Sequence, residues 1–282
     1  MLVCTLGDLL LDVVVRLGTP LTPGSDAPAE IALSAGGQAA NVAAWAVSLG
    51  ADARLICRRG GDSAAQLAEE GLAERGVEIV GPRTPEGGGV VVSLVEPGGD
   101  RTMASDRGAS PGLRATDIDP DWLDGAGSLH LSGYSLLREP IARAAHHVAW
   151  LAGTRGVRRS VDLAAAPLIE SYGPERFRAE LAELAPEIVF ATLLEEQALG
   201  GPLPGTTWVR KLGPDGCEVL HDGGRLTLPI EPGAVVDSTG AGDALAAGFL
   251  LGGNAESALR SGLAAAARCV ATVGAMPNRV SP

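Results

Sequence analysis

Asp237-Ser238-Thr239-Gly240-Ala241-Gly242-Asp243 is a polar, glycine-flanked turn that leads into the largely helix-favouring run of residues 244–250. A glycine-flanked turn that opens a helix presents unpaired backbone N–H groups and the positive end of the helix dipole, and together they attract an anion. Gly240 and Gly242 would let the backbone approach a phosphate closely. Asp243 would stand on the first helical turn, where a carboxylate can accept a proton from an attacking hydroxyl.

Other interpretations of this stretch are weaker. Only 39 residues follow Asp243, so the second half of a dinucleotide-binding domain has no room. The only lysine, Lys211, lies between Arg210 and Leu212, which excludes a Walker A loop, and no Gly-rich loop of a protein kinase lies near it. An ordinary aspartate-capped helix after a glycine turn stays open as an alternative. Phosphoryl transfer without a Walker lysine is the functional interpretation that remains.

The rest of the chain alternates between short apolar runs and amphipathic runs, which is typical of a parallel sheet with helices on its faces. We expect strands at residues 3–6, 9–17, 54–57, 77–80, 128–131, 159–162, 188–190 and 207–211, followed by a hairpin of 217–220 with 225–228. We expect helices at residues 37–49, from 62 or 63 to about 75, at 138–153, 175–184 and 241–251, and from 255 to about 273. This order predicts a doubly wound, mainly parallel α/β fold.

Two segments interrupt the alternation. Residues 90–95 and 101–104 flank the turn-forming sequence Glu96-Pro97-Gly98-Gly99-Asp100 and predict a β-hairpin, whereas residues 21–33 look irregular. We expect a small β lid, built from about residues 13–34 and 83–106, on a single domain that spans residues 1–282.

Composition narrows the class of function. The chain has 282 residues and a net charge of −12, which opposes the concentrated basic face that nucleic-acid binding needs. Its four cysteines show no metal or disulfide spacing, and no apolar run is long enough to span a membrane. We therefore expect a cytoplasmic protein with small-molecule partners, neither a nucleic acid nor a membrane.

Two signatures in the expected order resemble those of the ribokinase-like (PfkB) carbohydrate kinase family. The first is Gly36-Gly37-Gln38-Ala39-Ala40-Asn41 and the second is the stretch of residues 237–243. The likeness extends along the whole chain, through Gly7 with Asp12, Gly61-Asp62, Gly133, Thr192-x-x-Glu195, Lys211-Leu212-Gly213 and Gly274-Ala275. The resemblance implies a ribokinase-like, Rossmann-like doubly wound fold and an ATP-dependent sugar kinase.

The resemblance also implies roles for individual residues. Asp243 would be the general base, and the amides of Gly240, Ala241 and Gly242 would form an anion hole for the transferring phosphoryl group. The positions that match sugar-binding residues of the family are Asp12, Gly36, Gly37, Gln38 and Asn41. The positions expected near the nucleotide are Thr192, Lys211, Gly213 and Gly216. Gln38 replaces the lysine of ribokinases, so ribose itself is not favoured.

Metal ions are implied by the same resemblance. Glu195 matches a residue near the phosphates and Mg²⁺, although Thr192 replaces the usual asparagine and the adjacent Glu196 leaves the register open. Asp237, Thr239, Gly274 and Asn278 match the region where family members hold a monovalent cation such as K⁺.

The lid segments bear on the substrate because they contain no Phe, Tyr or Trp. Nucleoside bases are commonly bound by stacking on aromatic side chains, so a sugar is favoured over a nucleoside. Arg107 and Arg138 would suit a sugar acid or a phosphosugar. We expect ATP-dependent phosphorylation of a hydroxymethyl group of a small sugar or sugar acid. A nucleoside kinase and a noncatalytic sugar-binding regulatory homologue are the alternatives, and a homodimer through the lid is a further expectation.

Overall fold

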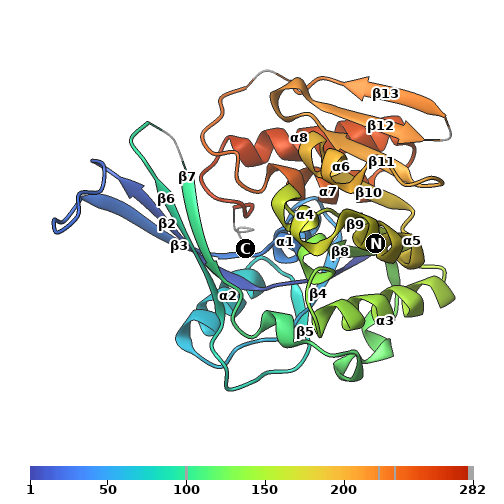
Figure 1. Cartoon of the computed structure of the whole chain (residues 1–282), viewed down its shortest axis with the longest axis horizontal. Helices are drawn as coiled ribbons and strands as arrows, with labels where there is room; N and C mark the ends of the chain where they lie inside the picture. Colours follow the sequence, from blue (N-terminus) through green and yellow to red (C-terminus); the bar gives the residue numbers. More distant parts are fainter. Residues whose placement is uncertain (99–100, 222, 232, 279–282) are drawn as a thin grey trace.

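A nine-stranded sheet forms the centre of the computed structural model, which describes residues 1–98, 101–221, 223–231 and 233–278 (Figure 1). Its strand order is β13-β12-β11-β10-β9-β8-β1-β4-β5. The strands are β1 (Leu2–Leu6), β4 (Asp52–Ile56), β5 (Glu78–Val80), β8 (Ala126–Ser132), β9 (Arg158–Asp162), β10 (Ile188–Thr192), β11 (Thr207–Lys211), β12 (Cys217–His221) and β13 (Gly224–Leu228).

The direction of the strands confirms the mainly parallel α/β fold. All neighbours from β11 to β5 pair in parallel, and only β12 and β13 are added antiparallel at one edge, as the expected hairpin. Parallel strands are buried on both faces, which explains why their sequences read as short, nearly continuous apolar runs.

Helices cover both faces of this sheet. They are α1 (Gln38–Ser48), α2 (Ser63–Ala73), α3 (Ile141–Thr154), α4 (Ala166–Tyr172), α5 (Pro174–Leu184), α6 (Leu193–Leu199), α7 (Ala241–Leu251) and α8 (Ala255–Val270), with short 3-10 turns at Ser110–Gly112, Ala115–Asp117, Pro120–Leu123, Gly133–Ser135 and Gly213–Asp215. One core joins α1, α2, α7 and α8 to sheet residues such as Val3 and Phe190. The second joins α3, α5 and α6 to the alternate sheet residues, such as Cys4 and Val189.

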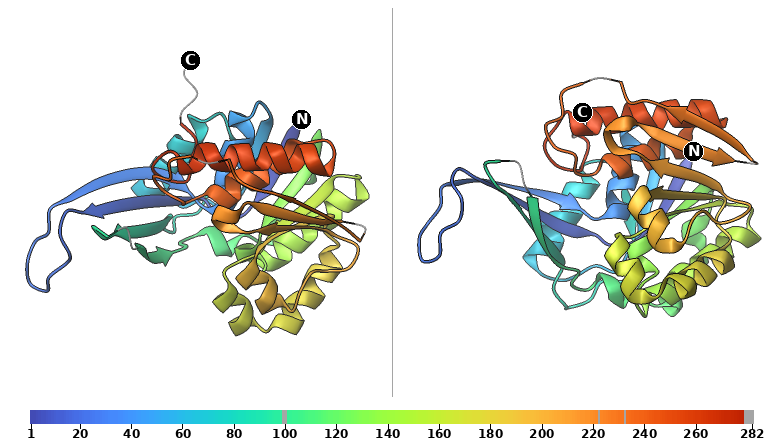
Figure 2. Two further views of the ribbon diagram at one scale, coloured as in Figure 1. Left: turned by 90° about the horizontal axis from the view of Figure 1, so that it is seen from above. Right: turned by 45° about the horizontal axis from the view of Figure 1, so that its top comes forward.

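A second, four-stranded sheet projects from the body of the molecule (Figure 2), and we call it the lid sheet. Its order is β3-β2-β6-β7, with β2 (Leu10–Leu17), β3 (Ala29–Gly36), β6 (Gly89–Val95) and β7 (Arg101–Asp106). The predicted hairpin of β6 and β7 is confirmed. That this sheet closes over the site, and that residues 1–282 form a single domain, stay predictions.

Three local expectations need correction. The segment that looked irregular ends in a strand, β3, whose residues 29–33 are exposed, so its sequence carries no buried periodicity. Helices α4 and α6 were not anticipated, because each has only seven residues. Helix α3 begins at Ile141, after the Glu139–Pro140 bond, and not at residue 138.

The carboxyl ends of the parallel strands define where a site can form. Asp162, Thr192 and Lys211 are the last residues of β9, β10 and β11 and therefore share one edge of the sheet. In open α/β sheets, ligands bind outside this edge. In the part of the chain that the structure describes, no helix is long and apolar enough to cross a membrane.

Candidate active site

The start of α7 has the geometry of an anion site. Gly240 precedes the helix with a φ of 77°, which favours glycine, and the Ala244 amide donates a 2.9 Å hydrogen bond to the Gly240 carbonyl. The amides of Gly242 and Asp243 have no acceptor among the described residues, and the Ala241 amide makes only a 3.4 Å contact with the Ser238 carbonyl. These donors point to where negative charge can be bound.

Asp243 lies on this first turn beside a residue of the N-terminal signature. The Asn41 side-chain amide donates a 2.7 Å hydrogen bond to Asp243 Oδ2, so the two signatures meet. Burial, and then the negative charge of Asp162, raise the pKa of Asp243 to about 7, while Asn41 and Lys211 oppose the rise. A carboxylate with this pKa is a stronger base than an ordinary aspartate, and about half of it is ionised at neutral pH.

The N-terminal signature brings its glycines against two aspartates. A Cβ at Gly36 would collide with the Asp12 carboxylate, and one at Gly37 would collide with the Asp8 carbonyl. Gly37, with a φ of 103° and a backbone neighbour, requires glycine, whereas a side chain at Gly36 would displace the Asp12 carboxylate. Burial raises the pKa of Asp12 to about 7, with Arg101 opposing. Gln38 begins α1, and its Oε1 accepts a 2.6 Å hydrogen bond from the Ser132 hydroxyl.

A second polar cluster lies at the ends of β9, β10 and β11. Lys211 donates a 2.6 Å hydrogen bond to the fully buried Asp162, and its Nζ lies 3.9 Å from Glu195 Oε2. Burial alone would lower the pKa of Lys211, but these two carboxylates raise it above its ordinary value, so the ammonium stays charged. Lys211 also approaches the α7 start, because a Cβ at Gly242 would lie 3.5 Å from its Nζ.

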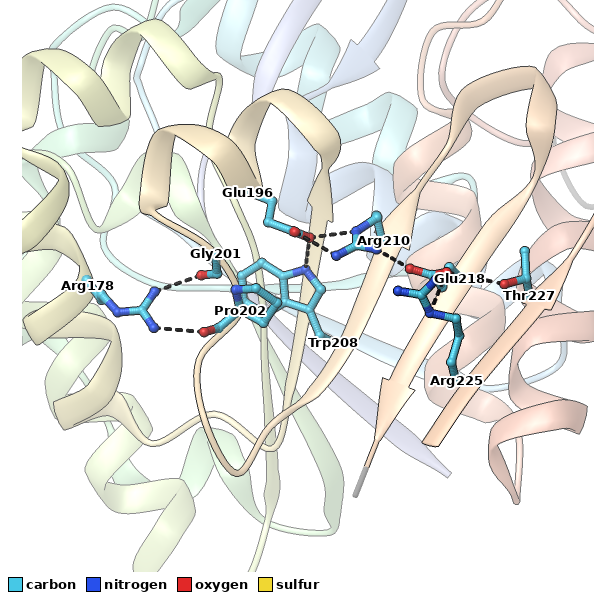
Figure 3. Close-up of polar contacts among 9 residues, drawn as sticks. All are labelled: Arg178, Glu196, Gly201, Pro202, Trp208, Arg210, Glu218, Arg225 and Thr227. Carbon is cyan, nitrogen blue, oxygen red and sulfur yellow. Dashed lines mark hydrogen bonds and ion pairs between the residues drawn. The ribbon is translucent and has the colours of Figure 1, made fainter. Parts of the chain in front are cut away.

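Thr192 and Glu195 form the first turn of α6. The Thr192 hydroxyl accepts from the Glu195 amide at 3.2 Å, and Glu195 Oε2 accepts from the Thr192 amide at 2.8 Å, which is a capping box. The other glutamate, Glu196, is bound to Arg210 (Figure 3). Of the two glutamates, Glu195 is the one that lies near Lys211, and its match to the metal-binding position stays a prediction.

The residues expected to hold a monovalent cation are only partly assembled. Asp237 accepts hydrogen bonds from the Thr239 amide at 2.9 Å, the Thr239 hydroxyl at 2.6 Å and the Gly274 amide at 2.9 Å. Burial raises the pKa of Asp237, but these hydrogen bonds outweigh it and keep the pKa below its ordinary value. Asn278 is exposed near the end of the described chain.

The two arginines expected at the substrate differ in their surroundings. Arg107 donates to both Asp8 oxygens, at 2.6 and 2.9 Å, and to the Tyr134 carbonyl at 3.2 Å. Its guanidinium is thus engaged in holding the strand β1 end against the lid sheet. Arg138 is exposed. Of the glycines expected at the nucleotide, Gly213 is exposed and Gly216 is buried in the turn before β12.

Three residues near the site were not indicated by the sequence motifs. Asp162 ends a buried strand, a position that could have signalled a ligand-binding role. Asp8 follows Gly7 after β1, and its partner Arg107 is 99 residues away. Arg101 on β7 contacts the Thr239 hydroxyl and lies 3.7 Å from Asp237 Oδ1, a contact that spans more than 130 residues.

Comparison with known proteins decides the family. The model of the pfkB family carbohydrate kinases matches residues 2–281. The chain belongs to this family. As a pfkB-family member it is an enzyme, a carbohydrate kinase, which confirms the expectations of a kinase and a transferase.

Named relatives of the chain are sugar kinases. It is 32% identical over 268 residues to the ATP-dependent ribose-1-phosphate kinase of Halopiger xanaduensis, covering 91% of this chain and 88% of the relative. It is 30% identical over 267 residues to the 2-dehydro-3-deoxygluconokinase of Thermoproteus tenax, covering 84% and 80%. The fold matches the crystal structure of adenosine kinase from Sinorhizobium meliloti with a TM-score of 0.86 at 23% identity, over 98% of this chain and 95% of that one.

Proposed function

We propose that the protein transfers the γ-phosphoryl group of ATP to a hydroxymethyl group of a small sugar that carries a phosphate or carboxylate. The observation that carries this proposal is the 2.7 Å hydrogen bond from Asn41 to Asp243, which joins the two signatures at the start of α7. Both named relatives support the acidic sugar, since ribose 1-phosphate carries a phosphate and 2-dehydro-3-deoxygluconate carries a carboxylate.

Asp243 acts as general base in the proposed reaction. The sugar hydroxyl oxygen attacks the γ-phosphorus, its proton passes to the Asp243 carboxylate, and the bond from the γ-phosphorus to the β–γ bridging oxygen breaks to leave ADP. The amides of Gly240, Ala241 and Gly242 lie where they can stabilise the charge on the transferring group, and Lys211 adds a fixed positive charge beside them. A positioned base of this kind contributes about 10²–10⁴-fold.

The carboxylates beside Lys211 fit a magnesium ion that arrives with the nucleotide. Asp162 Oδ2 is buried without a hydrogen-bond partner in the described chain, and Glu195 offers a second carboxylate nearby. Mg²⁺ in nucleotide sites is bound by one or two carboxylates together with phosphates and water. The metal would supply charge neutralisation on the phosphates, and Asp162 and Glu195 are the residues that would hold it.

Arg101 is the side chain that we assign to the acidic group of the sugar. It extends from the lid sheet to the Asp237–Thr239 turn, and its charge opposes the raised pKa of Asp12. The five donors of a guanidinium allow it to bind Asp237 and a substrate anion together. Arg107, by contrast, is already bound to Asp8.

An Arg101→Gln variant tests this assignment. It should lower kcat/KM for a phosphosugar or sugar acid by about 10- to 100-fold, since a charge-assisted hydrogen bond contributes roughly 1.5–3 kcal/mol. A neutral sugar that is turned over slowly should be affected much less. Equal losses on acidic and neutral sugars would contradict the assignment.

The expected dependence on K⁺ and the expected cytoplasmic location stay predictions. Dependence on K⁺ is supported only by the meeting of Asp237 with Gly274. A cytoplasmic location is in keeping with four free, buried cysteines. The nucleoside kinase and the noncatalytic homologue remain the alternative functions.

A substrate panel separates these functions. ATP consumption by the wild-type protein is measured with ribose 1-phosphate, 2-dehydro-3-deoxygluconate, neutral sugars and nucleosides. The proposal predicts the highest kcat/KM on an acidic sugar. Turnover only on nucleosides would support the first alternative, and ligand binding without turnover would support the second.

A further inference from the structure

Two consecutive glutamates at the start of α6 contact two consecutive residues of β11. Glu195 lies near Lys211, at 3.9 Å, whereas Glu196 binds Arg210 (Figure 3). Successive residues of a strand point to opposite faces of the sheet, so Arg210 and Lys211 reach different surroundings from the same stretch of backbone. The proposed function uses Glu195 and Lys211 and leaves Glu196 and Arg210 without a role.

The contact between Glu196 and Arg210 is two-pronged and largely buried. Arg210 Nε and Nη2 donate to the two Glu196 oxygens at 2.8 and 2.6 Å, with the side chains only 15% and 12% exposed. The Trp208 indole donates a further 2.7 Å hydrogen bond to Glu196 Oε2. A guanidinium that binds a carboxylate with two parallel hydrogen bonds fixes orientation as well as distance. The first turn of α6 is therefore tied to β11 in one geometry.

Further contacts hold this pair in place from both sides. Arg210 also binds Glu218 of β12, whose side chain is 8% exposed and accepts from Arg225 and Thr227 of β13. At the other end of α6, Arg178 donates to the Gly201 and Pro202 carbonyls at 2.7 and 2.8 Å. Figure 3 shows the contacts from Glu196 through Arg210 to Glu218 as one connected network, with the contacts of Arg178 as a separate group.

Stability alone is a weak reason for such an arrangement. Removing two charges from water costs several kcal/mol per ion, and buried ion pairs often add nothing to stability relative to apolar residues. What the pair does supply is a fixed placement of its sequence neighbours. Any shift of α6 along β11 would change the distance between Glu195 and Lys211.

We propose that Glu196 and Arg210 are positioning residues for the nucleotide end of the active site. Through them, α6 and β11 present Glu195 and Lys211 at the separation that MgATP requires. The inference rests on the proposed function, because it takes Glu195 and Lys211 as the groups that meet the magnesium and the phosphates.

Two matched variants test the inference. Glu196→Gln and Glu218→Gln each remove one buried carboxylate from Arg210, but only Glu196 neighbours Glu195. Loss of an outer partner of a metal or phosphate site costs about 10- to 100-fold in affinity. We expect Glu196→Gln to raise the KM for MgATP and the Mg²⁺ concentration for half-activation at least tenfold, with the KM for sugar unchanged. Glu218→Gln should leave both KM values and the Mg²⁺ concentration for half-activation within about twofold of the wild-type values. It should lower the Tm by about as much as Glu196→Gln does.

Binding of MgADP can be measured without any turnover of sugar, so it gives an independent test. The Kd of MgADP, measured by calorimetry on the full-length protein, should weaken in Glu196→Gln and hold in Glu218→Gln. If the wild type binds MgADP but phosphorylates no sugar, the proposed function fails while this comparison still stands. Arg210→Lys keeps the charge but loses the two-pronged contact, so it serves as a second variant if Glu196→Gln does not fold. It too should weaken MgADP binding about tenfold. Equal effects of the two glutamine variants, or unchanged MgADP binding in both Glu196→Gln and Arg210→Lys, would overturn the inference.

Discussion

Asp243 and Asn41 are 202 positions apart in the chain, and a 2.7 Å hydrogen bond between their side chains stabilises the charged form of the proposed base. Burial raises the pKa of Asp243, whereas the Asn41 amide stabilises the charged carboxylate and lowers it, for a net value of about 7. Asp162 adds to the rise and Lys211 opposes it, so the pKa of the base is set by opposing contributions from different parts of the sequence.

Replacing Asn41 with alanine should shift the pH dependence of the reaction. Without the amide, the pKa of Asp243 rises, and because the base must be deprotonated, the acid limb of kcat/KM moves to higher pH. One lost hydrogen bond corresponds to a shift of about half to one pH unit. The profile is measured between pH 5.5 and 9. Asn254→Ala, which removes the cap of α8, serves as the control and should leave the limb in place. An unmoved limb in Asn41→Ala would argue against a role of Asn41 in tuning the base.

At this scale the sequence predicted the types of residue better than their partners. Asn41 is hydrogen-bonded to Asp243, and Lys211 lies 3.9 Å from Glu195, whereas their roles stay predictions. The role of Asp162 depends on a contact with Lys211 across 49 residues, and the engagement of Arg107 depends on Asp8. Neither contact leaves a local pattern in the chain, so no periodicity or spacing could have revealed it.

Among the elements, α7 is the one whose exact start matters most. Gly240 has a left-handed φ, and a Cβ there would lie 2.6 Å from Ala275, whose carbonyl accepts a 2.8 Å hydrogen bond from the Trp45 indole. The start of the helix is thus packed against the C-terminal segment, which is itself held by α1. This packing fixes the direction of the first-turn amides.

Gly240→Ala should damage both stability and activity. The added methyl group would collide with the backbone of Ala275, and alanine is strained at a positive φ. We therefore expect a loss of about 2–4 kcal/mol in unfolding free energy. Activity should fall at least 100-fold, because a displaced amide no longer stabilises the transferring group.

Gly205→Ala is the matched control, since its φ is +74° and nothing lies within 4 Å of the added atom. That variant should cost about 1 kcal/mol and keep full kcat, as measured by urea unfolding and a coupled assay. Full activity in Gly240→Ala would contradict the anion-hole assignment.

The success of sequence prediction also differed among elements for physical reasons. The bounds of α7, at Ala241–Leu251, were predicted because a glycine turn precedes the helix and a Gly-Gly pair follows it. The strand β3 was missed because most of its residues face solvent and need no apolar alternation. The seven-residue helices α4 and α6 are defined by their tertiary contacts more than by their own patterns.

On the scale of the whole molecule, the lid sheet has two faces of different character. Asp12 and Arg101 stand on one face, which meets the active site. On the other face Val13 packs against the main core, and farther along the strands an aliphatic cluster lies in register, namely Val15, Ile31, Leu33, Val92 and Leu94. Ile31 is 65% exposed and Leu33 is 56% exposed, so a second copy of the chain could cover this face.

We expect the protein to form a homodimer through this outer face, and a charge placed there should separate the two copies. Ile31→Arg with Leu33→Arg should convert a dimer of about twice the chain mass into a monomer, as measured by sedimentation equilibrium. Trp150→Arg is the control, because Trp150 is equally exposed but lies on α3 of the main body. A wild-type monomer, or a dimer unaffected by the lid substitutions, would contradict this prediction.

Single-turnover phosphorylation by Asp243→Asn tests whether Asp243 is the base of an ATP-dependent kinase that acts on an acidic sugar. The substitution preserves shape and can still accept the Asn41 hydrogen bond, so MgADP binding and the Tm should be maintained. We expect the rate of phosphoryl transfer at pH 8 to fall by about 10²–10⁴-fold. Transfer by Asp243→Asn at the wild-type rate would show that Asp243 is not the base.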